Sequence, residues 1–175
     1  MAAFATSYIP TQASQVTRAA DNASMLGDNF ATWFNASQGT LYAEATSSVP
    51  SSDAVVRFAA VVFDAASYSN ALRLERLGGS ARYVQTVSGV SNVATATWNA
   101  GDTVAIAAAY QNSNNAAAFN GGAAQAVAGN VPTGLVTLGI GGHGTISANS
   151  LCGYVRSISY YPTRLPNATL QSITA

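Results

Sequence analysis

Short apolar segments recur along the chain about every ten residues, with turn-forming residues between them. Several of them alternate apolar and polar residues, the period of a strand with one buried face. Val55–Asp64 is a nearly continuous apolar run, which predicts a strand buried on both faces. The predicted strands are residues 39–45, 55–64, 71–77, 81–87, 90–98, 103–110, 116–119, 123–127, 135–140 and 151–161. About ten to twelve short strands with regular turns predict an antiparallel sandwich or barrel.

The last predicted strand, Leu151–Tyr161, leads into a short closing helix. Pro162 cannot donate to a sheet and therefore ends the strand. Asn167 is the predicted N-cap of the helix, and Leu170 and Ile173 are spaced to pack together. Alternation places Tyr154, Arg156, Ile158 and Tyr160 on one face of the strand, and Val155, Ser157, Ser159 and Tyr161 on the other. Neither set is purely apolar, so alternation alone does not decide which of the two faces points toward the core.

Other local patterns place turns and connections. Gly78-Gly79 and Asn120-Gly121 predict tight turns, and Asn120-Gly121 is the strongest short hairpin signal in the chain. Met25–Phe34 concentrates large apolar residues and predicts a short strand or turn that plugs one end of the core. The alanine runs 107–109 and 116–118 favour helix by propensity, but each is short and bounded by turn residues, which favours strands.

Composition narrows the class of protein. The 175 residues predict one domain, 1–175, and 49% are hydrophobic while 8% are charged. There is no lysine and the net charge is zero, so nothing favours binding to nucleic acid or to an anionic membrane. A near-neutral surface favours association, and the single cysteine, Cys152, excludes an internal disulfide. No apolar run approaches the roughly 20 residues of a membrane-spanning helix.

Both ends of the chain resemble a known family. Gly153–Ala175 (GYVRSISYYPTRLPNATLQSITA) is similar to the closing motif of a domain common in tailed-bacteriophage structural proteins. Thr6–Asp21 (TSYIPTQASQVTRAAD) is similar to the opening motif, and Phe30–Glu44 (FATWFNASQGTLYAE) fits the next block. That family resembles concanavalin A-like lectins, glucanases and laminin-G domains. The resemblance implies an all-β jelly-roll sandwich of two antiparallel sheets with a short C-terminal helix.

The resemblance also implies a function. We expect a non-enzymatic virion structural protein, made in the bacterial host cytoplasm and displayed on the particle surface as a capsid decoration or tail-associated protein. Its partners would be other virion proteins, and a homo-oligomer, for example a trimer, is expected. Residues 1–20 would be an extended arm that adds a strand to a neighbour. The alternative is a glycan-binding adhesin module of a tail fibre that recognises host surface carbohydrate.

Catalytic and metal chemistry find little support in the sequence. The related glucanases place three carboxylates on alternating positions of one strand, whereas Glu44 and Glu75 are each isolated here. We therefore predict no catalytic residue, no cofactor and no metal site. Calcium is the alternative, because lectin relatives hold it with loop carboxylates and amides. The candidate clusters are Asp21, Asn22, Asp28 and Asn29, and Asn112, Asn114 and Asn115.

Glycan binding would require an exposed aromatic ring for stacking and planar amides for hydrogen bonds to hydroxyls. Trp98 and Tyr110 are the candidate rings, because each stands beside amide side chains. The candidate polar partners are Asn112, Asn114, Asn115 and His143, the last in the loop sequence Gly-Gly-His-Gly. The alternative is that both rings end their strands by packing into the core, as large aromatic residues usually do.

Overall fold

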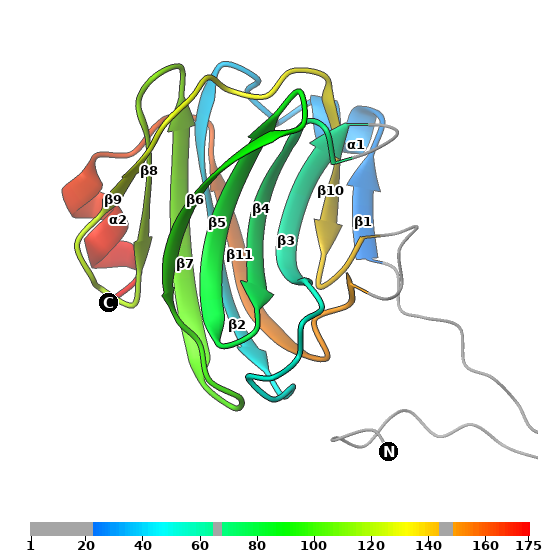
Figure 1. Cartoon of the computed structure of the whole chain (residues 1–175). Helices are drawn as coiled ribbons and strands as arrows, with labels where there is room; N and C mark the ends of the chain where they lie inside the picture. Colours follow the sequence, from blue (N-terminus) through cyan, green and yellow to red (C-terminus); the bar gives the residue numbers. More distant parts are fainter. Residues whose placement is uncertain (1–22, 65–67, 144–148) are drawn as a thin grey trace, which may run out of the picture.

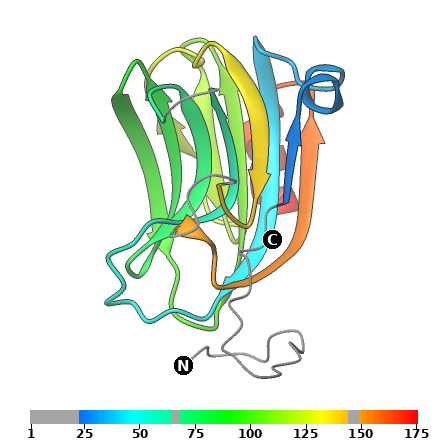
Figure 2. The same cartoon turned by 90° about the vertical axis from the view of Figure 1, so that its right-hand side faces the viewer.

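The computed structural model describes residues 23–64, 68–143 and 149–175, which form two antiparallel sheets packed face to face (Figures 1 and 2). The six-stranded sheet has the order β1 (Ala23–Leu26), β10 (Leu135–Ile140), β3 (Arg57–Asp64), β4 (Ala71–Leu77), β5 (Ser80–Val87) and β6 (Val90–Thr97). The five-stranded sheet has the order β11 (Gly153–Tyr161), β2 (Gln38–Ser47), β7 (Thr103–Gln111), β8 (Asn115–Phe119) and β9 (Gln125–Val127). Two short helices, α1 (Asp28–Ala31) and α2 (Asn167–Ile173), complete the described chain. The predicted all-β sandwich with a short C-terminal helix is confirmed.

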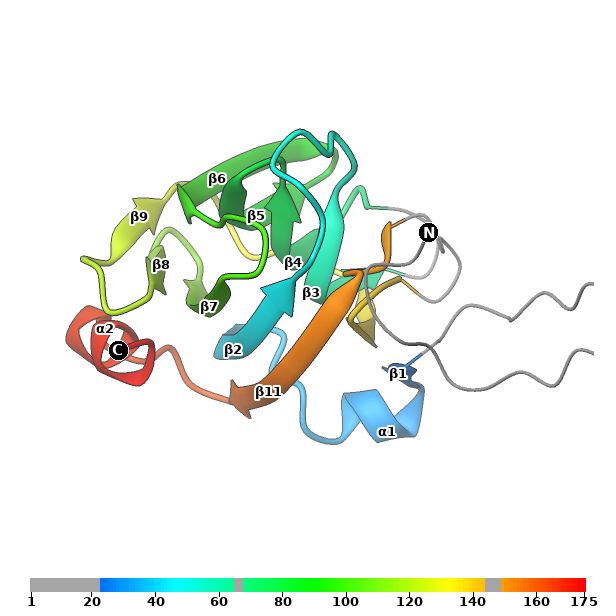
Figure 3. The same cartoon turned by 90° about the horizontal axis from the view of Figure 1, so that it is seen from below.

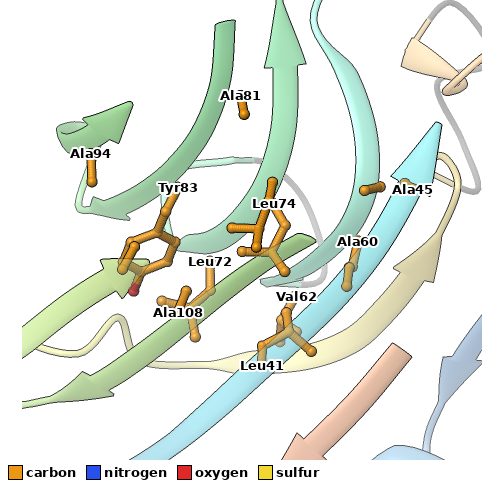
Figure 4. Close-up of a cluster of buried hydrophobic side chains, with 14 of the residues drawn as sticks. Leu41, Ala45, Ala60, Val62, Leu72, Leu74, Ala81, Tyr83, Ala94 and Ala108 are labelled. Atoms are coloured by element: carbon orange, nitrogen blue, oxygen red, sulfur yellow. The ribbon is translucent and has the colours of Figure 1, made fainter. Parts of the chain in front are cut away.

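Side chains of the two inner faces meet in one core between the sheets, part of which Figure 4 shows. Leu72 and Leu74 of β4 point into this space from one sheet, and Leu41 of β2 points into it from the other. All of β3 from Phe58 to Phe63 is buried, as the continuous apolar run predicted. Val62 faces the core between the sheets, while Phe58, Val61 and Phe63 form a second apolar cluster with Ala71.

Helix α2 packs on the outer face of the five-stranded sheet (Figure 3). Tyr42 of β2 packs beside the fully buried strand residues beneath the helix, which are alanines: Ala107, Ala109, Ala116 and Ala118. Their small side chains let the helix approach closely, and Leu170 fills the contact with Ile173 beside it, as predicted. The alanine runs therefore form strands, also as predicted, because they are covered on both faces.

Two details of the C-terminal region differ from the sequence predictions. Pro166, not Asn167, is the N-cap of α2; Asn167 is the first helical residue and accepts a hydrogen bond from Arg164 Nη2 at 2.6 Å. The pairing of β11 with β2 shifts between Val155 and Ser157. This bulge breaks the simple alternation, so Val155 and Ile158 both pack against the core although the alternation had placed them on opposite faces.

The segment predicted as a plug, Met25–Phe34, contains the end of strand β1 and the whole of helix α1. Phe30 of α1 is buried, and its ring stacks on Phe34 with centroids 4.6 Å apart. Trp33 packs edge-on against Tyr160 of β11 at 4.8 Å. The predicted packing role is therefore correct, while the helix was not predicted. The predicted arm, residues 1–20, lies outside the described residues, and the single-domain prediction for residues 1–175 stays a prediction.

We expect the core between the sheets to dominate stability, which a matched pair of valine substitutions tests. Val62 is 1% exposed and Val90 is 67% exposed. Val62→Ala should lower the free energy of unfolding by roughly 2–3 kcal/mol, through lost burial and a residual cavity, whereas Val90→Ala should change it by less than about 0.5 kcal/mol. Urea denaturation followed by tryptophan fluorescence measures both. Equal losses in the two variants would contradict the assigned core.

Candidate functional site

The two aromatic residues predicted to stack on sugars are both buried. Trp98 is 0% exposed, and its Nε1 donates to the Asp102 carbonyl at 3.0 Å. Tyr110 is 1% exposed, and its hydroxyl donates to the Asn35 carbonyl at 2.7 Å and meets the Tyr160 hydroxyl at 2.8 Å. Burial, with the Tyr160 hydrogen bond, raises the pKa of Tyr110. Neither ring offers a free face, so the core-packing alternative describes both residues.

The three asparagines predicted as glycan or calcium ligands brace the turn between β7 and β8. Asn115 Oδ1 accepts from the Gln111 amide at 3.0 Å, and its Nδ2 donates to the Gly129 carbonyl at 2.7 Å. Asn112 Oδ1 accepts from the Val131 amide at 2.9 Å. The Nδ2 of Asn114 donates to Gln111 Oε1 at 3.2 Å. These hydrogen bonds hold neighbouring loops together. They account for asparagine at all three positions, so no bound ligand is needed to explain these residues.

The predicted site residues do not form one site. Trp98 contacts Asp102 just before β7, Tyr110 lies near the far end of β7, and His143 packs on Phe63 of β3. Asp21 and Asn22 of the other calcium cluster lie outside the described residues. Within residues 23–64, 68–143 and 149–175, no group of three histidine, cysteine, aspartate or glutamate side chains could hold a metal ion. No helix in the same ranges is long and apolar enough to cross a membrane.

A different set of polar residues gathers on the outer face of the six-stranded sheet, the face toward the viewer in Figure 1. Arg73 and Glu75 stand two residues apart on β4, and Arg82 of β5 lies opposite Glu75 in the antiparallel register. Arg73 Nε is 3.6 Å from Glu75 Oε2, and Arg82 Nε is 3.3 Å from Glu75 Oε1. We call Arg73, Glu75 and Arg82 the arginine cluster.

Neighbouring side chains fix Arg73 in place. Its Nη2 donates to Thr86 Oγ1 at 3.0 Å, and Thr86 and Ser91 share a hydroxyl hydrogen bond at 2.8 Å. The guanidinium carbon also lies 5.7 Å from the centroid of the Tyr68 ring, within the range of a cation–π contact. The side chain is therefore ordered by the protein itself.

The arginine cluster is positively charged and lies near the surface. Glu75 is 0% exposed; burial raises the pKa of its carboxyl group, while Arg73 and Arg82 act in the opposite direction. The side chain of Arg82 keeps 20% of its surface exposed, and no hydrogen bond within the described part of the chain engages its Nη atoms. Two guanidinium groups around one carboxylate leave an excess positive charge, which suits an anionic ligand group.

His143 lies beside the arginine cluster, within an aromatic group on the same face. Its ring is 3.9 Å from that of Phe63 and 4.8 Å from that of Tyr68, centroid to centroid. Burial lowers the pKa of His143 and raises the pKa of Tyr68 to about 12. His143 is 8% exposed, so this predicted glycan partner is a packed ring and not an exposed loop side chain.

Sequence reasoning missed the arginine cluster, although the signal was present. The Gly78-Gly79 turn pairs Leu77 with Ser80, and counting back along the hairpin pairs Glu75 with Arg82. Alternation then puts Arg73 on the same face as Glu75. Glu75 looks isolated along the chain because its charged partner stands across the hairpin, at Arg82.

No protein-family model matches the sequence, and no curated protein matches it. Solved structures do match. The CBM40 carbohydrate-binding module of the Ruminococcus gnavus IT-sialidase, bound to α2,3-sialyllactose, has a TM-score of 0.69 and 14% identity, over 91% of this chain and 95% of that chain. The leech intramolecular trans-sialidase has a TM-score of 0.67 and 13% identity, over 90% of this chain and 26% of that chain. A SAP-like pentraxin from Limulus polyphemus has a TM-score of 0.57 and 11% identity, over 79% and 70% of the two chains.

At these identities the likeness shows the fold, a jelly-roll sandwich of the concanavalin A-like lectin kind. This agrees with the fold that the sequence resemblance implied. None of the three proteins is a bacteriophage protein, so the finer resemblance to phage structural proteins stays a prediction.

The packing of His143 predicts a specific pH dependence of stability. Because burial holds its pKa in the folded protein below the ordinary 6.5, the unfolded chain takes up the proton first as the pH falls. The free energy of unfolding should therefore decrease from about pH 6.5 downward, until the folded-state pKa is passed. His143→Phe, which keeps an aromatic ring, should flatten the profile in this window. The sequence has one histidine, so an NMR titration of its ring protons gives the pKa directly; a value of 6.5 or above would contradict the packing.

Proposed function

We propose that this chain is a non-catalytic carbohydrate-binding module that binds a glycan bearing a carboxylate. The observation that carries the proposal is the arginine cluster, two arginines held around a buried glutamate on the outer face of the six-stranded sheet. The CBM40 module with the similar fold was solved with α2,3-sialyllactose, which is a carboxylate-bearing glycan. This supports the adhesin-type alternative from the sequence over a purely structural role.

The chemistry of the cluster fits such a ligand in two respects. The side chain of Arg82 is partly exposed, and its guanidinium group can bond a carboxylate through two parallel hydrogen bonds. Glu75 keeps both guanidinium groups close together, because without its charge Arg73 and Arg82 would repel each other. The ring of Tyr68 adds an aromatic surface at the edge of the cluster, close to His143.

Display on a bacteriophage particle, with other virion proteins as partners and a trimeric assembly, stays a proposal that rests on the sequence resemblance. It is compatible with glycan binding, because an adhesin module would recognise host carbohydrate from the particle surface. Localising the chain by labelled antibodies on a purified particle would test it. Absence of the chain from particles would remove the virion part of the proposal and leave the binding function untouched.

Arg82→Ala should weaken binding of α2,3-sialyllactose at least about tenfold, because a charge-assisted hydrogen bond to the carboxylate is lost. Arg82→Lys should weaken binding less, since lysine keeps the positive charge but cannot form the bidentate pair of hydrogen bonds. Isothermal titration calorimetry with α2,3-sialyllactose, and with lactose as the uncharged comparison, measures both.

Arg156→Ala is the matched control, because Arg156 is an exposed arginine on β11 of the other sheet and should leave binding unchanged. Circular dichroism establishes that each variant is folded. Equal affinity for lactose and α2,3-sialyllactose, or undiminished binding by Arg82→Ala, would show that the arginine cluster is not the binding site.

A further inference from the structure

A polar pocket lies on the side of the sandwich opposite the arginine cluster, on the outer face of the five-stranded sheet. It has a volume of about 310 Å³ and is formed by β2, the start of β7, Asn120 in the turn after β8, and the residues that end α2, Thr174 and Ala175. Figure 3 shows α2 on this outer side of β7 and β8, away from β4 and β5. The pocket therefore shares no residue with the arginine cluster.

The strand register places the polar groups of this pocket. Tyr42 and Glu44 stand two residues apart on β2 and share its outer face, with Ala105 of β7 opposite Glu44. One row further along, Thr46 and Thr103 share a hydroxyl hydrogen bond of 2.8 Å. Tyr42, opposite Ala107, packs against the apolar cluster beneath the helix, which leaves the rows of Glu44 and Thr46 uncovered.

Three polar groups in the pocket remain available to a ligand. Within the described part of the chain, no hydrogen bond or ion pair engages the Glu44 carboxylate or the Tyr42 hydroxyl. Asn120 Oδ1 accepts from the Ala105 amide at 2.8 Å, which orients the side chain and leaves its Nδ2 to donate. Thr174 Oγ1 accepts from the Gly121 amide at 3.0 Å and so holds this turn against the end of α2.

We propose that this pocket is a second carbohydrate site that takes a neutral sugar. The Glu44 carboxylate can only accept hydrogen bonds, whereas Asn120 Nδ2 and the Tyr42 hydroxyl can donate them. A sugar hydroxyl can donate and accept, so a polyhydroxyl ligand satisfies all three groups. The volume lies at the small end of ligand pockets, which range over roughly 300–1,000 Å³, and suits one sugar unit.

Other ligand classes fit the pocket less well. An anionic sugar would face the Glu44 carboxylate without a compensating cation from the residues that line the pocket. A calcium ion takes six to eight oxygen ligands, usually with several carboxylates, and its charge would face the donor Nδ2 of Asn120.

The two sites therefore divide ligands by charge: the arginine cluster takes the carboxylate-bearing unit, and the Glu44 pocket takes a neutral one. The inference does not depend on the arginine cluster, since each site has its own residues and its own variants. Loss of acidic-glycan binding in Arg82→Ala and loss of neutral-sugar binding in a Glu44 variant are independent results.

Amide chemical shifts of the ¹⁵N-labelled protein, titrated with lactose, galactose and glucose at millimolar concentrations, test the proposal. At least one of these sugars should shift amides around Glu44, Asn120 and Thr174 in a saturable manner. Glu44→Gln should weaken that binding several-fold, because a neutral amide oxygen replaces the charged acceptor and gives a weaker hydrogen bond. Tyr42→Phe, which removes the hydroxyl alone, should weaken it less.

Asp28→Asn is the matched control, because it removes one exposed carboxylate of α1 and should leave neutral-sugar binding unchanged. Arg82→Ala should likewise leave it unchanged. The spectra themselves show whether each variant is folded. No saturable shift near Glu44 with any of the three sugars would overturn the proposal, as would equal weakening by Asp28→Asn. Shifts confined to the neighbours of Arg73 and Arg82 would place all sugar binding on the six-stranded sheet and overturn it too.

Discussion

Strand β4 presents Leu72 and Leu74 to the space between the sheets, and Arg73 and Glu75 to the outer face of the six-stranded sheet. The two-residue period of a strand couples these placements, because a shift of register by one residue would carry both charged side chains into the core. Burying an unpaired charge costs far more than the burial of one leucine gains. The core leucines therefore fix where the arginine cluster stands, and a rigid core supports the candidate site.

The fold was predictable from the sequence because its determinants are local. Turn residues bound each strand, and the uninterrupted apolar run of β3 correctly indicated burial on both faces. The details that were predicted wrongly depend on contacts between segments that are distant in the sequence. Arg156 is the extra residue of a bulge in β11, which exists because β11 pairs with β2, more than a hundred positions away. Helix α1 is a single turn that holds Phe30 in the core, and its four residues carry no helical periodicity.

The candidate site was less predictable, because burial decides which aromatic residues can meet a ligand. Trp98 and Tyr110 stand next to turns in the sequence, yet their rings fold inward and bond to backbone carbonyls. Nothing in the neighbouring residues distinguishes such a ring from an exposed one. The arginine cluster, in contrast, follows from the Gly78-Gly79 turn and the alternation of β4 and β5. Cross-strand register is thus a better guide to polar sites in this fold than proximity along the chain.

The two proposed sites differ in how much order the protein supplies before a ligand binds. Arg73 is already held by Thr86 and by the Tyr68 ring, and Arg82 by its ion pair with Glu75. A ligand at the cluster therefore saves part of the cost of immobilising a long side chain, about 0.5–1.5 kcal/mol. Glu44 has no such support within the described chain, and its pocket is open to solvent on the sheet surface. With 8% charged residues the protein also exerts little long-range attraction. Selectivity must then come from short-range geometry, which favours tighter binding at the arginine cluster and weaker binding at the Glu44 pocket.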